Sequence, residues 1–128
     1  MGIYCGTDII EIDRIKKSLE KCGTSFFVRV FTESEISYCE SKNNAKFKSY
    51  AARFAAKEAV AKALGTGIDE GICWKDIEVT NNVRGKPCVT LHGRAKDIFE
   101  AIGGADISLS LSHCENYAVA FAVIKTSV

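Results

Sequence analysis

Asp8, Glu58 and Lys62 are the residues whose types and spacing point most directly to chemistry. Asp8 stands in the mostly apolar stretch GIYCGTDII, where a buried carboxylate is costly unless a cation, a metal or amide donors compensate its charge. Glu58 and Lys62 are four residues apart and share one face of a helix. Mg2+ accepts one or two protein carboxylates and completes its shell with water and phosphate oxygens. Asp8 and Glu58 are therefore candidate magnesium ligands, and Lys62 adds positive charge suited to phosphoryl-type displacement.

Each of these residues also has an ordinary structural interpretation. An aspartate at a strand end often caps the following turn. A Glu followed by a Lys four residues later often makes a surface pair worth about 0.3 to 0.5 kcal/mol. The alanine-rich surroundings of Glu58 in RFAAKEAVAKAL allow close packing, but they also suit a plain helix. The residues alone leave these alternatives open.

Weaker signals come from one histidine and several glycines. His113 follows a predicted strand with alternating serines, and a histidine at a strand end more often has a structural role than a catalytic one. Gly65 after the helix, and Gly85 before Lys86 and Pro87, allow a backbone to approach a ligand closely. No GxxxxGK[ST] motif is present, so these glycines do not form a Walker loop.

The first half of the chain predicts one strand followed by helices. Residues 2–10 are rich in isoleucine, which favours a strand, and Ile12, Ile15 and Leu19 then follow helical spacing up to Gly23. Thr32 and Glu35 have the T-x-x-E spacing of a capping box, so a further helix should begin near Glu33. Residues 49–64 contain strong helix formers, and Gly65 ends this central helix.

The second half predicts a hairpin, a short helix and two more strands. Residues 77–79 and 88–92 read as strands joined by a turn, and residues 94–102 as a helix. Strands are expected at 106–112 and 117–125, and the second is apolar on both faces, which favours a central position. The order predicts an α+β fold, a single domain over residues 1–128 with a mostly antiparallel sheet packed against helices.

Charge and cysteine usage narrow the function classes. The 17 Lys and Arg nearly cancel the 16 Asp and Glu, so nothing global indicates a nucleic-acid binder. The six cysteines include no CxxC pair, which indicates reduced thiols rather than a zinc site. The chain begins without signal-peptide character and has no apolar run near the roughly 20 residues that span a bilayer, so no membrane contact and a cytoplasmic location are expected.

Six segments in order resemble the holo-(acyl-carrier-protein) synthases: GTDIIEIDRI, FTESEISYC, RFAAKEAVAKALGTG, WKDIEV, GKP and SLSHCENYAVA. The resemblance covers nearly the whole chain and implies the 4'-phosphopantetheinyl transferase fold. It places the magnesium carboxylates on Asp8 and Glu58 and brings Lys62 close to the phosphates of coenzyme A. It also places contacts to the adenosine and its phosphates on Arg53, on the GKP turn at 85–87 and on His113.

The same resemblance implies a reaction, a partner and an assembly. Phosphopantetheine would pass from coenzyme A to a serine of an acidic acyl carrier protein, releasing adenosine 3',5'-bisphosphate and activating the carrier for fatty acid synthesis. A metal-bound water, Glu58 or His113 remain candidates for the base. A homotrimer with sites between subunits is expected, so that Asp8 and Glu58 meet the GKP turn of a neighbouring chain.

A local basic surface fits the acidic partner, and two other functions stay open. The first helix carries Arg14, Lys16, Lys17 and Lys21, and Arg29 follows it in the sequence. The alternative interpretation of these residues is an ordinary solvated helix face. The enzymatic alternative is another magnesium-dependent phosphotransferase or nucleotide hydrolase. The non-enzymatic alternative is an α+β interaction module in which Asp8, Glu58 and Lys62 form only a buried ion network.

Overall fold

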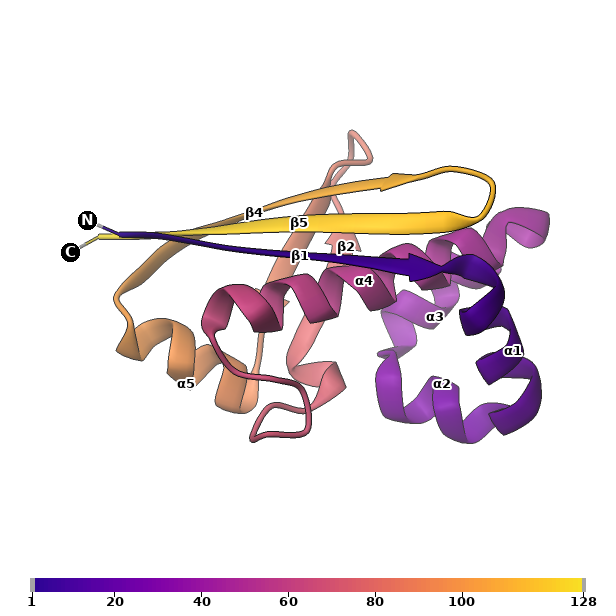
Figure 1. Ribbon diagram of the computed structural model, residues 1–128, viewed down its shortest axis with the longest axis horizontal. Helices are drawn as coiled ribbons and strands as arrows, with labels where there is room; N and C mark the ends of the chain where they lie inside the picture. The colour runs from indigo at the N-terminus through magenta and orange to yellow at the C-terminus, as the bar shows by residue number, and fades with distance from the viewer. Residues whose placement is uncertain (1, 128) are drawn as a thin grey trace.

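A three-stranded antiparallel sheet, covered by helices on one side, organises the chain (Figure 1). The structure is a computed structural model and describes residues 2–127. The elements follow the predicted order: β1 (Ile3–Glu11), α1 (Ile12–Cys22), α2 (Thr24–Val30), α3 (Glu33–Glu40), α4 (Lys46–Leu64), β2 (Ile77–Asn81), β3 (Pro87–Leu91), α5 (Gly93–Ala101), β4 (Gly104–His113) and β5 (Tyr117–Thr126). Short 3-10 turns occupy Asn43–Ala45 and Trp74–Asp76. The predicted α+β class with a mostly antiparallel sheet is confirmed.

β5 is the central strand of the sheet, with β1 and β4 on its two sides, which confirms the prediction made from its apolar sequence. Its alternate residues Ala118, Ala120, Ala122 and Ile124 are buried beneath the sheet. The opposite face carries Phe121, which is 47% exposed, because no helix of the described chain lies on that side (Figure 1). One face of an apolar central strand is therefore uncovered in a single chain.

The central helix α4 lies against β1 and β5 at unusually short range, and Gly6 is the reason. A Cβ placed on Gly6 would lie 2.1 Å from the carbonyl oxygen of Ala59 and 2.7 Å from the amide nitrogen of Ala63. The backbone of β1 therefore lies directly against the backbone of α4, because glycine has no side chain and alanine has only a methyl group. Asp8 is two residues beyond Gly6 and therefore lies on the same face of β1, so this contact fixes the distance between Asp8 and α4.

Gly6→Ala is expected to destabilise the fold more than an ordinary surface substitution. The added methyl group would collide with the α4 backbone, and overpacking of this kind typically costs about 1 to 3 kcal/mol or more. Urea denaturation of Gly6→Ala beside Gly67→Ala measures the effect. Gly67 is a suitable control because an added Cβ there would meet only the Glu70 side chain. Equal unfolding midpoints would show that the β1 to α4 contact is less tight than described.

The helices around the sheet begin and end largely where the local signals predicted. Thr32 and Glu35 form the predicted capping box at the start of α3, with each side chain bonded to the backbone of the other residue. Gly65 ends α4 in the left-handed conformation with φ 81°. α4 begins at Lys46, three residues before the predicted start. The apolar segment at 24–30, for which no element was predicted, is the helix α2.

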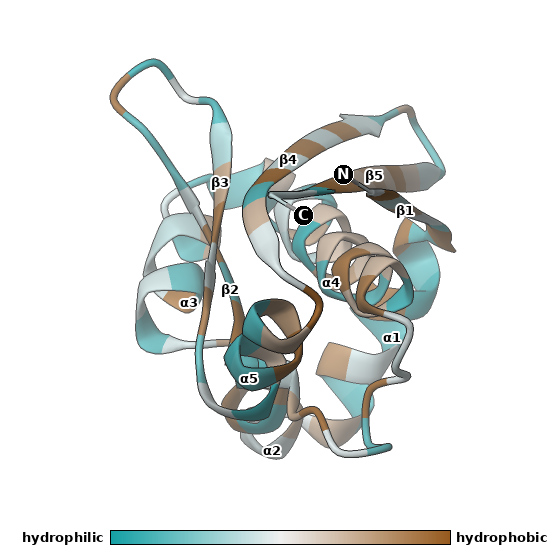
Figure 2. Ribbon diagram, turned by 90° about the vertical axis from the view of Figure 1, so that its left-hand side faces the viewer, coloured by the Kyte–Doolittle hydropathy of each residue, from teal (hydrophilic) through white to brown (hydrophobic). Residues whose placement is uncertain are grey.

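β2 and β3 form a separate two-stranded sheet that projects beside the main one (Figure 2). An aromatic cluster joins α4 to α2 and to the turn before β2: Phe54 packs on Trp74 with ring centroids 4.6 Å apart and stacks on Phe26 at 6.3 Å. Across residues 2–127, no helix has both the length and the apolar character that a membrane crossing requires.

Candidate active site

Asp8, Glu58 and Lys62 line one cavity of about 420 Å³, which we call the carboxylate cavity. β1 supplies Asp8, and α4 presents Glu58 and Lys62 on successive turns of one face. The apolar part of the lining comes from β1 and the helices: Ile9, Ile10, Ile15, Phe26 and Phe54. Arg14 and Ser18 of α1 complete the lining. The strand and the central helix thus bring the three predicted residues together.

Lys62 is the direct partner of Asp8 in this cavity. Its ammonium nitrogen lies 3.1 Å from a carboxylate oxygen of Asp8 and 2.9 Å from the carbonyl oxygen of Thr7, to both of which it donates. The Asp8 side chain is 19% exposed and that of Lys62 is 54% exposed. The lysine therefore compensates the strand carboxylate while keeping access to solvent, where an anionic ligand would approach.

Glu58 is electrostatically strained in the ionised form. Burial raises its pKa above the ordinary value, the negative charge of Asp8 raises it further, Lys62 lowers it, and Asp69 adds a smaller increase. A cation placed between the two carboxylates would relieve both the desolvation and the repulsion. Asp69, which lies in the loop after α4 and has a positive φ of 71°, was not identified from the sequence.

The two carboxylates suit Mg2+ as a donor set. Oxygen ligands at one edge of a solvated cavity match its preference for one or two carboxylates with the remaining positions taken by water and phosphate oxygens. Among residues 2–127 there is no group of three or more His, Cys, Asp and Glu side chains that could hold a metal by themselves. Further ligands to a metal held by Asp8 and Glu58 would come from water and substrate.

Arg53 lies in a second cavity, of about 440 Å³, between α3, α4 and the β2–β3 hairpin, which we call the hairpin cavity. Its side chain is 3% exposed, its guanidinium stacks 3.9 Å from the centroid of the Tyr38 ring, and it donates a hydrogen bond to Asn81. Lys42 lies on the same ring, 4.6 Å from the centroid. Tyr38 and Asn81 were not predicted as site residues, because their role depends on packing between distant segments.

The GKP turn adjoins the hairpin cavity, and Gly85 is one of its lining residues. Gly85 has φ 82°, a conformation that favours glycine, and its carbonyl accepts a hydrogen bond from Asn81. Lys86 is exposed and its amide donates to the Asn82 side chain, while Pro87 begins β3. These hydrogen bonds fix the shape of the turn, and the lysine side chain lies at the surface.

His113 and Gly65 lie outside both cavities. His113 is exposed at the end of β4, and Gly65 ends α4 one turn beyond Lys62. No residue lines both the carboxylate cavity and the hairpin cavity. The structure therefore divides the predicted residues into two groups, one around Asp8 and one around Arg53.

Comparison with known proteins agrees with the fold. Residues 4–122 match the family model of the 4'-phosphopantetheinyl transferase superfamily. The chain is 55% identical over 125 residues to a holo-(acyl-carrier-protein) synthase of Ruminiclostridium cellulolyticum, covering 98% of this chain and 93% of the relative.

Solved structures extend the likeness to three dimensions. The synthase of Neisseria meningitidis matches with a TM-score of 0.86 and 33% identity, over 96% of this chain and 98% of that one. The synthase of Helicobacter pylori, solved in complex with coenzyme A, matches with a TM-score of 0.83 and 32% identity, over 94% and 99%. Family, fold and near-complete coverage agree, so the chain belongs to the 4'-phosphopantetheinyl transferase superfamily, among its holo-(acyl-carrier-protein) synthases.

Proposed function

We propose that this synthase works through Asp8 and Glu58 as magnesium ligands and Lys62 as a phosphate contact, with coenzyme A as donor and the serine of an acyl carrier protein as acceptor. The observation that carries the proposal is the meeting of the two carboxylates and the lysine in one cavity with an apolar wall. The wall provides a surface for the uncharged pantetheine arm, and the charged edge provides one for the pyrophosphate.

The reaction joins the serine oxygen to the phosphorus nearest the pantetheine and breaks the bond from that phosphorus to the bridging pyrophosphate oxygen, so adenosine 3',5'-bisphosphate leaves. When bound, Mg2+ supplies neutralisation of the charge that develops on the pyrophosphate. Lys62 reaches the same edge and orients a phosphate as a point charge. Among the side-chain candidates for the base, Glu58 lines the cavity and His113 does not, which favours Glu58 as the acceptor of the serine proton.

A homotrimer is part of the proposal, and the uncovered sheet face supports it. The open face bears exposed apolar residues in cross-strand rows, including Ile9 at 65% and Phe121 at 47%, with Val119 between them. Neighbouring exposed apolar side chains on one face favour an interface. A neighbouring chain seated there would allow its hairpin cavity to meet the carboxylate cavity, which would unite the two separated groups.

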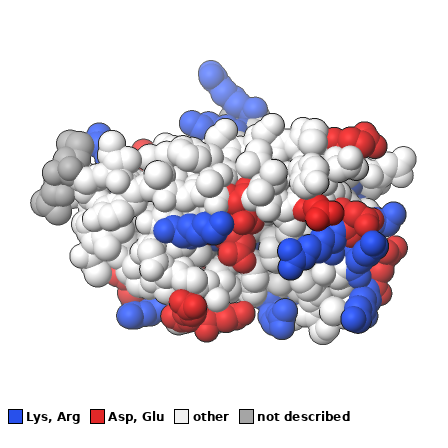
Figure 3. Space-filling model, viewed as in Figure 1, with Lys and Arg blue, Asp and Glu red and all other residues white. Residues whose placement is uncertain are grey.

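The docking surface proposed for the carrier protein follows α1. A groove there is lined by Arg14, Lys17 and Lys21, together with Glu11 and Asp13. Figure 3 shows Lys and Arg side chains over α1 at the right of the view, interspersed with acidic ones. Lys17 is already paired with Asp13 at 2.9 Å, which leaves Arg14 and Lys21 as the stronger candidates to attract an acidic partner.

Arg14→Glu is expected to raise the Michaelis constant for the carrier protein roughly tenfold at low salt, because charges at the rim of a contact steer association. The effect should shrink as salt rises, since the Debye length falls from about 10 Å at 0.1 M to about 3 Å at 1 M. Steady-state kinetics with Arg94→Glu on α5 provide the control, as Arg94 is also exposed. Identical behaviour of the two variants would move the docking surface away from α1.

The proposed location is the cytoplasm. All six cysteines are free thiols, and five of them are exposed. Exposed thiols without disulfides suit a reducing compartment.

The decisive test is incubation of the protein with apo carrier protein, coenzyme A and magnesium, followed by intact mass measurement of the carrier. The expected result is a carrier heavier by one phosphopantetheine, dependent on Mg2+. An unmodified carrier, with coenzyme A consumed by hydrolysis or not at all, would instead support another phosphotransferase or a non-catalytic module.

A further inference from the structure

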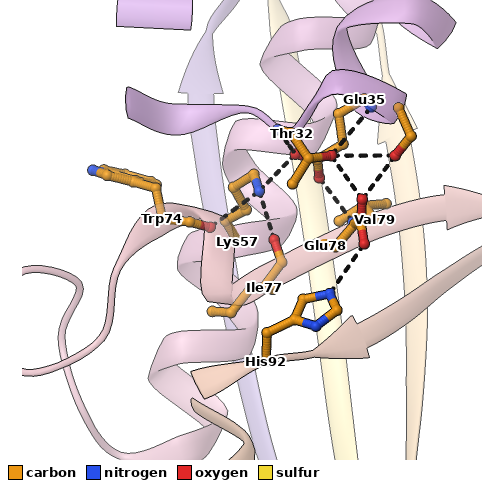
Figure 4. A network of polar contacts seen from close by, with 9 residues as sticks. Thr32, Glu35, Lys57, Trp74, Ile77, Glu78, Val79 and His92 are labelled. Carbon is orange, nitrogen blue, oxygen red and sulfur yellow. Dashed lines mark hydrogen bonds and ion pairs between the residues drawn. The ribbon is translucent and has the colours of Figure 1, made fainter. Parts of the chain in front are cut away.

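Lys57, next to the candidate ligand Glu58 in α4, has a fully buried ammonium group that is bonded on every side (Figure 4). It lies 2.9 Å from a carboxylate oxygen of Glu35 and donates to the carbonyl oxygens of Trp74 and Ile77. Its three N–H donors are thus all satisfied. Burial lowers the pKa of Lys57, and the charge of Glu35 opposes that shift.

Glu35 extends these bonds to two more segments. One carboxylate oxygen accepts from the backbone amide of Thr32 at 2.8 Å, and the other accepts from the backbone amide of Val79 at 2.8 Å. The side chain is also completely buried. The Lys57–Glu35 ion pair therefore connects four segments through hydrogen bonds: the start of α3, the middle of α4, the turn at Trp74 and strand β2.

Glu78 forms a second set of hydrogen bonds, on the solvent side of the Lys57–Glu35 pair. Its carboxylate accepts hydrogen bonds from the hydroxyls of Thr32 and Ser34, both at 2.8 Å, and contacts His92 of the segment after β3 at 3.0 Å. The hydrogen bonds to this carboxylate lower its pKa to about 2. Both β2 and the end of β3 are consequently anchored to α3 by charged groups.

The anchored hairpin carries the second candidate site. Val79 and Asn81 of β2 line the hairpin cavity, and Asn81 accepts the hydrogen bond from Arg53. The hairpin forms its own two-stranded sheet and shares no ladder with the main sheet. Its position relative to α4 therefore depends on side-chain contacts, of which the Lys57–Glu35 pair is a central one. α4, in contrast, is held along its length by β1 and β5.

We infer that Lys57 and Glu35 are positioning residues, which hold the β2–β3 hairpin at the angle to α4 that the nucleotide end of coenzyme A requires. The inference rests on the proposed function. A buried ion pair is poor evidence for stability by itself, since apolar residues of similar volume often replace one without loss. Here, however, both partners bond backbone groups of the hairpin strand, which an apolar pair cannot do.

Lys57→Met tests the inference because methionine keeps the unbranched length of the side chain and removes its donors. The matched control is Ile124→Ala, a buried position on β5 that destabilises the core without touching the network. Both variants are assayed where denaturation curves show them fully folded. For Lys57→Met we expect a Michaelis constant for coenzyme A about tenfold higher or more, with kcat and the magnesium requirement nearly unchanged. The preference for coenzyme A over dephospho-coenzyme A should also shrink.

Amide hydrogen exchange supplies a readout that needs no activity. In Lys57→Met, exchange at Val79 and across the hairpin should accelerate while β1 and β5 keep their protection. In Ile124→Ala, exchange should accelerate in β1 and β5, while Val79 and the rest of the hairpin keep their protection. If Lys57→Met fails to fold, Glu35→Gln takes its place, since it retains the size of the side chain but leaves the ammonium without a counter-charge.

The outcomes separate this inference from the proposed function. A wild-type protein that does not modify carrier protein overturns the proposed function, whereas the exchange experiment still tests the anchoring. An active wild type, together with a Lys57→Met variant whose hairpin protection and coenzyme A constants equal those of the control, overturns the positioning role. A loss confined to kcat overturns it as well, because it would place Lys57 in the chemistry rather than in nucleotide binding.

Discussion

Glu58→Gln is expected to lose roughly 100-fold or more of the transfer activity while making the folded protein more stable at neutral pH. Mutation of groups that merely support metal ligands often costs 10- to 100-fold, so loss of a ligand should cost at least as much. The stability gain has a separate origin, since burial and the nearby Asp8 disfavour the charged form of Glu58 and glutamine removes that charge without changing the shape.

The pH dependence follows from the raised pKa of Glu58. The folded protein holds the Glu58 proton more tightly than the unfolded chain, so ionisation costs folding free energy at pH values above the folded pKa. Below the ordinary value of 4.5 both states are protonated and the cost disappears. The stability advantage of Glu58→Gln should therefore be present at pH 7 and vanish as the pH falls below about 4.5.

Thermal unfolding at several pH values, with and without Mg2+, measures both effects. Asp8→Asn is the matched control, because it removes the other carboxylate but also breaks the ion pair with Lys62. It should lose activity without gaining stability at pH 7. Magnesium should raise the melting temperature of the wild type and of neither variant. A Glu58→Gln enzyme with wild-type turnover across a magnesium titration would remove Glu58 from the metal site.

Elements with local signals were predictable from the sequence. The T-x-x-E pattern at Thr32 contains both partners of a capping box within four residues, so their bonds can be anticipated without knowing the fold. Gly65 ends α4 for an equally local reason, the left-handed conformation that it adopts at the helix end. The central place of β5 was predicted because its sequence is apolar on both faces, a pattern that favours an interior strand.

Features that depend on distant partners were not predictable. Glu35 has the spacing of a capping residue, yet its other partners are Lys57 and Val79, far away in the chain. Lys57 stands in KEAVAK, where a lysine normally faces solvent, and only the fold buries it. Similarly, the aromatic and β-branched residues of α2 have low helix propensity, and burial of Phe26 and Val30 outweighs it.

The residues of the carboxylate cavity could be predicted from the sequence, but the separation of Arg53 into a second cavity could not. Asp8, Glu58 and Lys62 share a cavity as expected, whereas Arg53 faces the hairpin on another side of the same helix. Arg53 and Glu58 are five residues apart, which turns their side chains about 140° from one another around a helix with 3.6 residues per turn. One chain therefore cannot bring them to one small ligand by α4 alone, and a second chain supplies the simplest solution.

Two inactive variants should restore activity when they are assembled together, if sites form between subunits. Glu58→Gln damages the carboxylate cavity, and Arg53→Met damages the hairpin cavity while keeping the packing of the arginine stem. In a mixed trimer, a site that takes its carboxylates from an Arg53→Met subunit and its hairpin from a Glu58→Gln neighbour contains no mutated residue. A mixed trimer holds the two variants in a ratio of two to one, so one of its three sites is intact and about a third of wild-type activity is expected.

Coexpression of the two variants with different affinity tags, followed by sequential purification, yields the mixed oligomers for assay. The matched control pairs Glu58→Gln with Lys62→Ala, since both substitutions fall in the carboxylate cavity and every site then carries one defect. Phe121→Glu, which places a charge on the open face of the sheet, should prevent assembly and leave either combination inactive. Activity of the first mixture no greater than that of the control would mean that each subunit completes its own site, and Arg53 would then serve the fold through Tyr38 and Asn81 rather than the nucleotide.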